Sequence, residues 1–246
     1  MHNPLISIRR YTIPLLLLAF ALVVAPSTQQ AGAQVVQHYK QTNLVSNLAS
    51  LAPTMDPNLV NSWGLARSSR SPWWVADNGT GLSTVYDGTG KPASLVVTIP
   101  PADTSSTTGT PTGIIFNGNS AAFPIAPGKA ASFLFVTEDG TISGWNPGVK
   151  PTQTVLVVNN KEKSVYKGAT IATVDTASGT QTYLYVADFR KGRIEVFDAN
   201  FNKAFSSEER FDDDSLPPGF APFNVQNIGG NRHAAGPACD RGTGNA

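Results

Sequence analysis

Three stretches of the chain alternate apolar and polar residues, break at a glycine, and then alternate again. They lie at 73–87, 134–146 and 184–198. Alternation with a period of two places successive side chains on opposite faces of a strand, and a glycine between two such runs indicates a tight turn. Each stretch is therefore predicted to form an antiparallel hairpin.

Further apolar segments flank these hairpins. A short run with a small residue precedes each one, and a segment rich in β-forming residues follows the first two; the preceding runs are 62–66, 111–115 and 166–170, a looser fourth run is 221–225, and the following segments are 93–100 and 152–158. The repeating unit is thus predicted to contain four antiparallel strands in about fifty residues. No segment beyond the N-terminal stretch shows helical periodicity.

The first and third hairpins repeat nearly the same phrase without a gap, so that Asp77 matches Asp188. In the second hairpin, Val136 and Glu138 are predicted to stand where the others carry Val and Asp. A repeated four-stranded unit is typical of a β-propeller, in which the blades surround a central channel. A β-sandwich is the alternative, but a β-sandwich does not require the same hairpin motif to recur at the same place in each repeating unit. We predict an all-β fold, and specifically a β-propeller.

The phrases also support a resemblance to known proteins. The stretch 184–198 resembles the NHL-type propeller repeat, and four segments resemble a bacterial family of exported, propeller-like conserved hypothetical proteins: 43–66, 73–91, 111–117 and 221–231. The resemblance covers about residues 43–231. It implies a secreted β-propeller, and it implies no activity and no cofactor.

Counting the units predicts an incomplete ring. Blades are expected to start near residues 61, 111, 166 and 221, which makes three full blades and part of a fourth within a domain at 34–231, derived from a six-bladed parent. The segment 232–246 lacks Val, Ile, Leu, Phe, Tyr, Trp and Met, and it is predicted to be a disordered or aberrant tail. A frameshift or a fragmentary gene is our hypothesis for it, and a naturally short variant is the alternative.

The N-terminal segment 1–33 has the features of a signal peptide. Arg9 and Arg10 precede an uncharged apolar run at 13–25, which is too short to span a bilayer comfortably. Ala31 and Ala33 supply the small residues of a cleavage site, with cleavage expected after Ala33. We therefore predict a secreted or periplasmic protein without a membrane span after cleavage, and an uncleaved anchor is the alternative.

The amino-acid composition argues against nucleic acid as a partner. Only 14% of the residues are charged and the formal net charge is +1, so no basic face is expected to bind nucleic acid. The one cysteine, Cys239, cannot form an intramolecular disulfide, and its neighbours do not form a zinc-binding pattern.

Three carboxylates, Asp77, Glu138 and Asp188, are expected at equivalent places after the second strand of successive units. Together they could offer oxygen ligands to Ca²⁺. Their recurrence favours a structural role instead, because a carboxylate at the end of a strand accepts hydrogen bonds from the following turn.

A hydrolytic site is the second hypothesis. Propeller lactonases and gluconolactonase-like hydrolases hold a metal with Glu, Asn and Asp from different blades, and Asn117, Asn224 and Asn227 lie near the ends of predicted inner strands. The three histidines do not provide a partner for acid–base chemistry, since they lie in the signal segment, near the mature N-terminus and in the tail: His2, His38 and His233. We assign no catalytic residue, and whether a metal binds is left open.

The tryptophans allow two interpretations. Trp63, Trp73, Trp74 and Trp145 could stack on carbohydrate, but most occupy repeat positions where packing between blades is the ordinary explanation. The sequence as a whole predicts an exported binding scaffold for an extracellular protein or glycan. The alternative is a metal-dependent hydrolase of lactone or ester substrates.

Overall fold

The computed structural model describes residues 39–176, 179–205, 219–228 and 231–235, the last five by their backbone alone. The chain divides into two units, Met1–Gln41 and Thr42–Ala246. Residues 39–41 of the first unit form no strand, and the fold below is that of the second unit. The predicted signal peptide at 1–33, like Cys239, lies outside the described residues.

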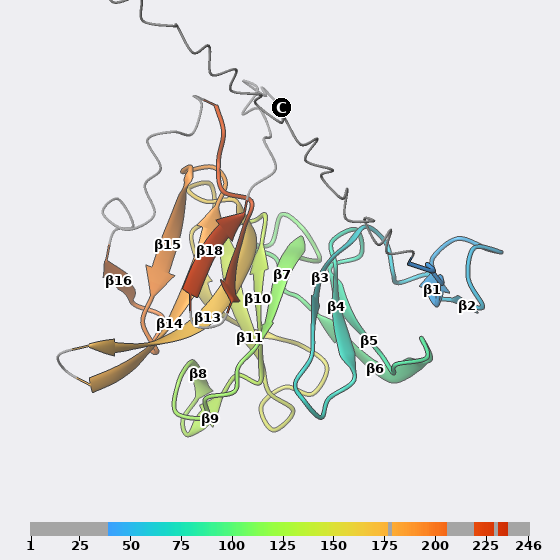
Figure 1. Ribbon diagram of the computed structural model, residues 1–246, viewed down its shortest axis with the longest axis horizontal. Helices are drawn as coiled ribbons and strands as arrows, with labels where there is room; N and C mark the ends of the chain where they lie inside the picture. Colours follow the sequence, from blue (N-terminus) through green and yellow to red (C-terminus); the bar gives the residue numbers. More distant parts are fainter. Residues whose placement is uncertain (1–38, 177–178, 206–218, 229–230, 236–246) are drawn as a thin grey trace, which may run out of the picture. The chain divides into compact units, whose positions relative to one another are not determined.

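Strands and turns make up the described part of the chain, which contains no helix (Figure 1). The strands are β1 (Val45–Ser46), β2 (Thr54–Met55), β3 (Ser62–Ala66), β4 (Trp73–Asp77), β5 (Leu82–Tyr86), β6 (Pro92–Thr98), β7 (Pro111–Phe116), β8 (Pro124–Ala126), β9 (Lys129–Ala130), β10 (Phe133–Thr137), β11 (Thr141–Trp145), β12 (Val155–Asn159), β13 (Tyr166–Thr176), β14 (Gly179–Asp188), β15 (Arg193–Phe197), β16 (Lys203–Phe205), β17 (Asn224–Ile228) and β18 (Asn231–Ala235). The predicted all-β class is confirmed. The described part of the chain accordingly contains no membrane-spanning helix.

Three four-stranded antiparallel sheets form the body of the unit. The first sheet has the order β3-β4-β5-β6, the second β7-β10-β11-β12 and the third β13-β14-β15-β16. The predicted hairpins are therefore present as β4–β5, β10–β11 and β14–β15. A small β8–β9 hairpin, which the sequence pattern did not indicate, is inserted between β7 and β10.

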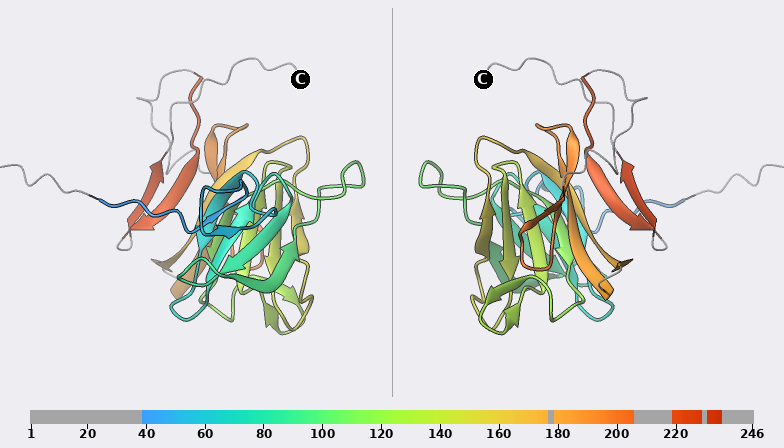
Figure 2. Two further views of the ribbon diagram at one scale, coloured as in Figure 1. Left: turned by 90° about the vertical axis from the view of Figure 1, so that its right-hand side faces the viewer. Right: turned by 90° about the vertical axis from the view of Figure 1, so that its left-hand side faces the viewer.

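The first strands of the three sheets are neighbours. Strand β3 lies against β7, β7 against β13, and β13 against β17, whereas β6 and β16 lie further out on either side in Figure 1. The β17–β18 hairpin stands beside the third sheet, as both views of Figure 2 show. Residues 231–235 of this hairpin include the first four residues of the segment predicted as a tail; residues 236–246 lie outside the described part.

One glycine on each first strand lets the strands approach closely. A Cβ added to Gly64 would lie 2.5 Å from the Thr112 carbonyl oxygen on the next sheet. A Cβ on Gly113 would lie 3.2 Å from the Ala169 backbone nitrogen, and one on Gly168 would overlap the Asn224 side chain. The small residue seen in each run of the sequence is thus required by the contact between sheets.

Apolar side chains fill the two spaces between the sheets. Trp74 lies between the first and second sheets, with ring centroids 4.5 Å from those of Phe133 and Trp145. On the opposite face of β10, Leu134 and Val136 pack against the third sheet. Because both faces of the second sheet are covered, every residue of β10 and β11 is buried. Phenylalanine and leucine therefore follow one another in β10, where a one-sided strand would alternate.

The structure corrects the expected place of Glu138. In the strand registers, Asp77 pairs with Ser62, Asp188 with Tyr166 and Thr137 with Pro111, so Thr137 is the third member of the set. The turn after β10 has one residue fewer than the turns after β4 and β14. The alignment of the second hairpin with the other two placed its whole gap in this turn, so residues before the turn were matched one position out of register. Glu138 lies in that turn.

Asp77 and Asp188 are fully buried and have structural hydrogen bonds. Asp77 accepts bonds from the Ser62 hydroxyl (2.8 Å) and from the hydroxyl and backbone N–H of Thr84 (2.7 and 3.1 Å). Asp188 accepts backbone bonds from Val165 and Lys191. They differ in their surroundings, because Lys191 forms an ion pair with Asp188 (3.2 Å), whereas the donors to Asp77 are the hydroxyl and amide groups of Ser62 and Thr84.

Substituting the glycine of the first sheet tests the close approach. Gly64→Ala places a methyl group against backbone atoms of Thr112 and Ile114, which no side-chain rotation can relieve. We expect a loss of about 1–3 kcal/mol in the free energy of unfolding, as for other overpacked sites. Gly88→Ala is the matched control, since nothing lies within 4 Å of its added Cβ. Equal urea midpoints for the two variants would contradict the constraint.

The buried Asp77 predicts a pH dependence of stability. Burial raises its pKa from 3.8 to about 6, against the lowering effect of the hydrogen bonds from Thr84 and Ser62. The folded state therefore holds this proton more tightly than the unfolded chain does. The resulting stabilisation is complete below about pH 4 and is lost as the pH rises to about 6, amounting to roughly 3 kcal/mol.

Asp77→Asn removes this titration. We expect the difference in unfolding free energy between the variant and the wild type to shift in favour of the variant by up to about 3 kcal/mol from pH 4 to pH 7. Urea unfolding at several pH values measures it, and any constant cost of the amide cancels in the comparison. Parallel stability curves for the two proteins would show that Asp77 does not titrate in this range.

Candidate functional site

A cavity of about 520 Å³ lies between the first strands β3, β7 and β13 and strand β17. We call it the first-strand cavity. Gly64, Gly113 and Gly168 lie in its wall, together with aromatic and cationic residues such as Trp63 and Arg67. None of the described residues that line it is an acid, a histidine or a cysteine. Its described lining thus offers apolar, aromatic, hydroxyl, amide and cationic side chains.

A β-bulge at the same place in each first strand sets the side chains near this cavity. The pairing register shifts between Ser62 and Leu65 in β3, and between Tyr166 and Ala169 in β13. The equivalent shift in β7 falls opposite Phe135 and Thr137. A bulge adds one residue to a strand and redirects its side chain. Trp63 and Lys167 occupy the bulges of β3 and β13 and both line the cavity.

Lys167 lies among three aromatic rings. Its Nζ is 4.6 Å from the ring centre of Trp63, 5.4 Å from that of Phe223 and 5.8 Å from that of Phe189. Trp63 and Phe223 stack on one another with ring centres 5.4 Å apart. A cation over an aromatic face is attracted by the ring quadrupole, so these rings hold the ammonium group in place.

Hydrogen bonds continue from this group across the sheets. Glu138 forms an ion pair with Lys167 and accepts a bond from the Asn78 amide (2.9 Å). Asn61 donates to the Asn78 side-chain oxygen (3.1 Å) and accepts from the Trp63 indole N–H (3.1 Å). The five side chains form one network that fixes this end of the cavity.

The other end of the cavity has a second pair of ring and cation. The guanidinium carbon of Arg67 lies 5.1 Å from the ring centre of Trp73. Phe116 and Leu65 also line this end, and their exposed fractions are 37% and 60%. Because these two apolar side chains are exposed within a concave site, a bound ligand can cover them.

The four tryptophans divide between the two predicted roles. Trp74 and Trp145 are buried in the core between the first and second sheets, as packing predicted. Trp63 and Trp73 line the cavity. The sequence could not separate them, because Trp73 and Trp74 are adjacent and their side chains take opposite faces of one strand.

The carboxylates considered for Ca²⁺ are not brought together. Glu138 is paired with Lys167, while Asp77 and Asp188 are buried in different sheets. Among the described residues, no group of three or more His, Cys, Asp or Glu side chains is placed to hold a metal ion.

The asparagines considered for a hydrolytic site are also separated. Asn117 uses its amide to bind three carbonyl oxygens, those of Asn119, Ala122 and Ala131. It organises the chain before β8 and does not line the cavity. Asn224 lines the cavity, whereas Asn227 does not. His2 and His38 lie outside the described residues, and His233 is described by its backbone alone.

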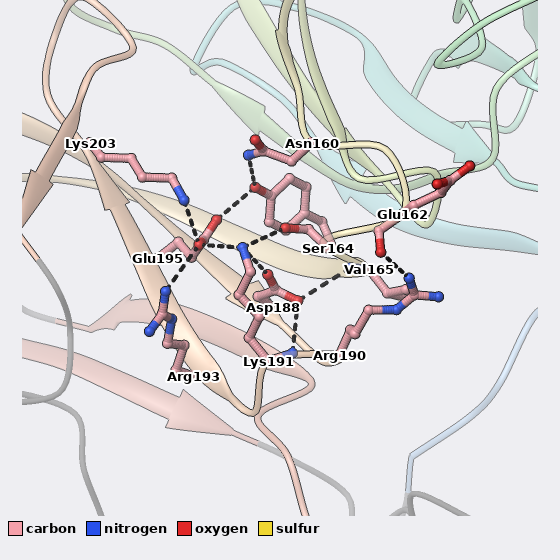
Figure 3. A network of polar contacts seen from close by, with 11 residues as sticks. Asn160, Glu162, Ser164, Val165, Asp188, Arg190, Lys191, Arg193, Glu195 and Lys203 are labelled. Atoms are coloured by element: carbon pink, nitrogen blue, oxygen red, sulfur yellow. Dashed lines mark hydrogen bonds and ion pairs between the residues drawn. The ribbon is translucent and has the colours of Figure 1, made fainter. Parts of the chain in front are cut away.

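A second polar network lies within the third sheet and has a structural role (Figure 3). Glu195 is buried and accepts from Lys191 (2.7 Å), Lys203 (2.8 Å) and the Tyr166 hydroxyl (2.7 Å). Burial alone would raise the pKa of Glu195, but the hydrogen bonds from these three donors outweigh it and lower the pKa to about 2. Asn160 donates in turn to the Tyr166 hydroxyl. A carboxylate with this many donors is held ionised and is poorly suited to proton transfer.

Comparison with known proteins finds relatives without an established activity. Three uncharacterized proteins of Acanthamoeba polyphaga mimivirus are similar to this chain. The first is 33% identical over 203 residues, which make up 80% of this chain and 48% of the viral protein. The second is 34% identical over 204 residues, 80% of this chain and 51% of its own length. The third is 32% identical over 124 residues, 48% of this chain and 22% of its own.

These findings overturn the expected family. No protein-family model matches the chain, so the NHL-type repeat is not supported, and the relatives are viral rather than bacterial exported proteins. The resemblance was misleading because alternating apolar residues, a carboxylate at a strand end and a glycine turn recur in any four-stranded antiparallel unit. The chain spans about half the length of the first two of these viral proteins.

Proposed function

We propose that the three sheets and the β17–β18 hairpin are consecutive blades of a β-propeller. Three features support the proposal: the sheets share one strand order, their first strands are neighbours, and each first strand carries a bulge and a glycine at the same place. Blades of a propeller surround a common channel, and the first-strand cavity would then be part of that channel.

On this basis the protein is an exported binding module, and its ligand is a glycan held in the first-strand cavity. The observation that carries this proposal is the combination of a cavity of about 520 Å³ with partly exposed tryptophan and phenylalanine side chains. Small-molecule sites have about 300–1,000 Å³ and are lined mostly by apolar and aromatic groups with a few polar ones. A concave site of this size fits a short oligosaccharide better than the broad face of a protein, which usually buries about 800 Å² per partner.

The hydrolase hypothesis lacks a comparable observation. Its required ligands and an acid–base partner do not converge on the cavity among the described residues. The binding experiment below also tests the hydrolase hypothesis, because a hydrolase would convert the added substrate into product instead of forming a stable complex with it.

Trp63→Ala tests the site. We expect the folded protein to bind at least one member of a panel of soluble oligosaccharides, measured by titration calorimetry, and the variant to bind it at least tenfold more weakly because a stacking surface is lost. Leu51→Ala is the control, since Leu51 is 54% exposed and does not line the cavity. Thermal unfolding of each variant verifies that it is folded. Failure of the folded wild-type protein to bind any sugar of the panel would contradict the proposal.

Export is tested separately. We expect a C-terminally tagged full-length chain, expressed in a bacterial host, to be recovered from the periplasm or the medium with Gln34 as its first residue. N-terminal sequencing of the recovered protein measures this, and replacing Arg9 and Arg10 with glutamate is expected to retain the protein in the cytoplasm. A cytoplasmic wild-type chain that still begins at residue 1 would contradict it.

A further inference from the structure

We infer that the first-strand cavity selects a glycan that carries carboxylate groups, with Arg67 and Lys167 as the residues that recognise its charge. This inference rests on the proposed function, because it concerns the ligand of the same cavity. It depends on a feature that glycan binding alone does not require, which is the placement of a cation beside an aromatic wall at each end of the site.

The two ends have matching chemistry. At one end, Lys167 lies beside the stacked rings of Trp63 and Phe223, and at the other, Arg67 lies beside Trp73. A sugar ring has an apolar face that can cover an aromatic side chain, and a carboxylate on its edge can then reach the neighbouring cation. Each end therefore provides both contacts that one acidic sugar residue needs.

The distance between the ends suits a chain of sugars rather than a single one. Trp63 and Arg67 are four residues apart on and just after β3. Because the bulge between Ser62 and Leu65 makes three residue steps span the length of two, this separation is about 10 Å along the strand. A ligand that uses both ends must therefore be elongated, with an acidic group near each end.

The charge of the wall favours an anion. The described residues that line the cavity include two cations and no acid. Glu138 neutralises Lys167 in the absence of ligand, but it lies in the turn after β10 and is not part of the wall. Arg67 donates hydrogen bonds to the Ser68 and Ser69 carbonyl oxygens, which carry no formal charge, so its own charge acts on the cavity. In a partly enclosed site this charge is less screened than at an open surface.

A pair of ligands that differ only in charge tests the inference. Tetragalacturonic acid and its full methyl ester have the same backbone, and titration calorimetry at low salt gives the affinity of each. We expect the acid to bind at least tenfold more tightly than the ester, and its affinity alone to fall when the NaCl concentration is raised. Equal affinity for the two, with both sensitive to Trp63→Ala, would overturn the inference and leave the proposed function standing. Binding of neither, with another sugar of the panel still bound, would overturn the inference alone, whereas binding of no sugar at all would overturn the proposed function as well.

Three variants assign the charge recognition. Arg67→Gln and Lys167→Gln are each expected to weaken binding of the acid at least fivefold more than they weaken binding of the ester. Lys150→Gln is the control, because Lys150 is exposed and does not line the cavity. If Lys167→Gln unfolds because its aromatic contacts are lost, Arg67→Gln decides alone. If a variant weakens binding of the acid and of the ester to the same degree, the substituted residue maintains the shape of the cavity and does not recognise the charge of the ligand.

Glu138→Gln gives an opposite effect. Because this carboxylate competes with a ligand anion for Lys167, its removal is expected to strengthen binding of the acid several-fold and not that of the ester. Weaker binding of the acid by a variant with an unchanged melting temperature would overturn this part of the inference.

Discussion

The close approach of the first strands is the constraint on which the rest of this structure depends. Gly64, Gly113 and Gly168 each place a bare Cα against the backbone or side chain of the following unit. At this separation even one methyl group would overlap its neighbour. With the first strands held so close, the three sheets meet along one line, and their faces can then enclose the two apolar cores on either side of the second sheet.

Buried polar groups at the end of the second strand are held differently in each of the three sheets. In the third sheet, Asp188 and Glu195 have lysine partners that balance their charge, and both accept hydrogen bonds. In the first sheet, Asp77 occupies the same place with hydroxyl and amide donors alone. The second sheet uses Thr137, whose hydroxyl bonds with Thr141. The equivalent positions 77, 137 and 188 thus form different hydrogen bonds in the three sheets. In each sheet they pair with N–H or O–H groups near the turn between the second and third strands.

The candidate site follows from the same packing. A bulge beside each close-packed glycine turns one side chain per sheet toward the first-strand cavity or its rim, and the three bulged positions differ where the framework positions agree. Trp63, Thr112 and Lys167 all line the cavity, but the Thr112 hydroxyl is engaged with the Val136 and Tyr166 carbonyl oxygens (3.1 and 2.8 Å). Repeated backbone geometry with unlike side chains is how a repetitive scaffold acquires a single specific site.

The local pattern of the sequence determined the strands, the three hairpins and the glycine of each first strand, because these depend on a two-residue period and on turns of a few residues. It indicated correctly that the carboxylate of Asp188 accepts a hydrogen bond from the following turn, whereas the donors to Asp77 lie on the neighbouring strands. It misplaced Glu138 by one position. The register depends on the length of the turn after β10, and the pattern of apolar residues does not show that this turn has one residue fewer than the equivalent turns. Only the tertiary structure decided that Trp74 is core while Trp63 lines a cavity, and that Lys167 lies among rings supplied by β3, the turn after β14 and the segment before β17. Those contacts join residues far apart in the chain, and their geometry is set by how closely the sheets pack, which no local sequence pattern contains.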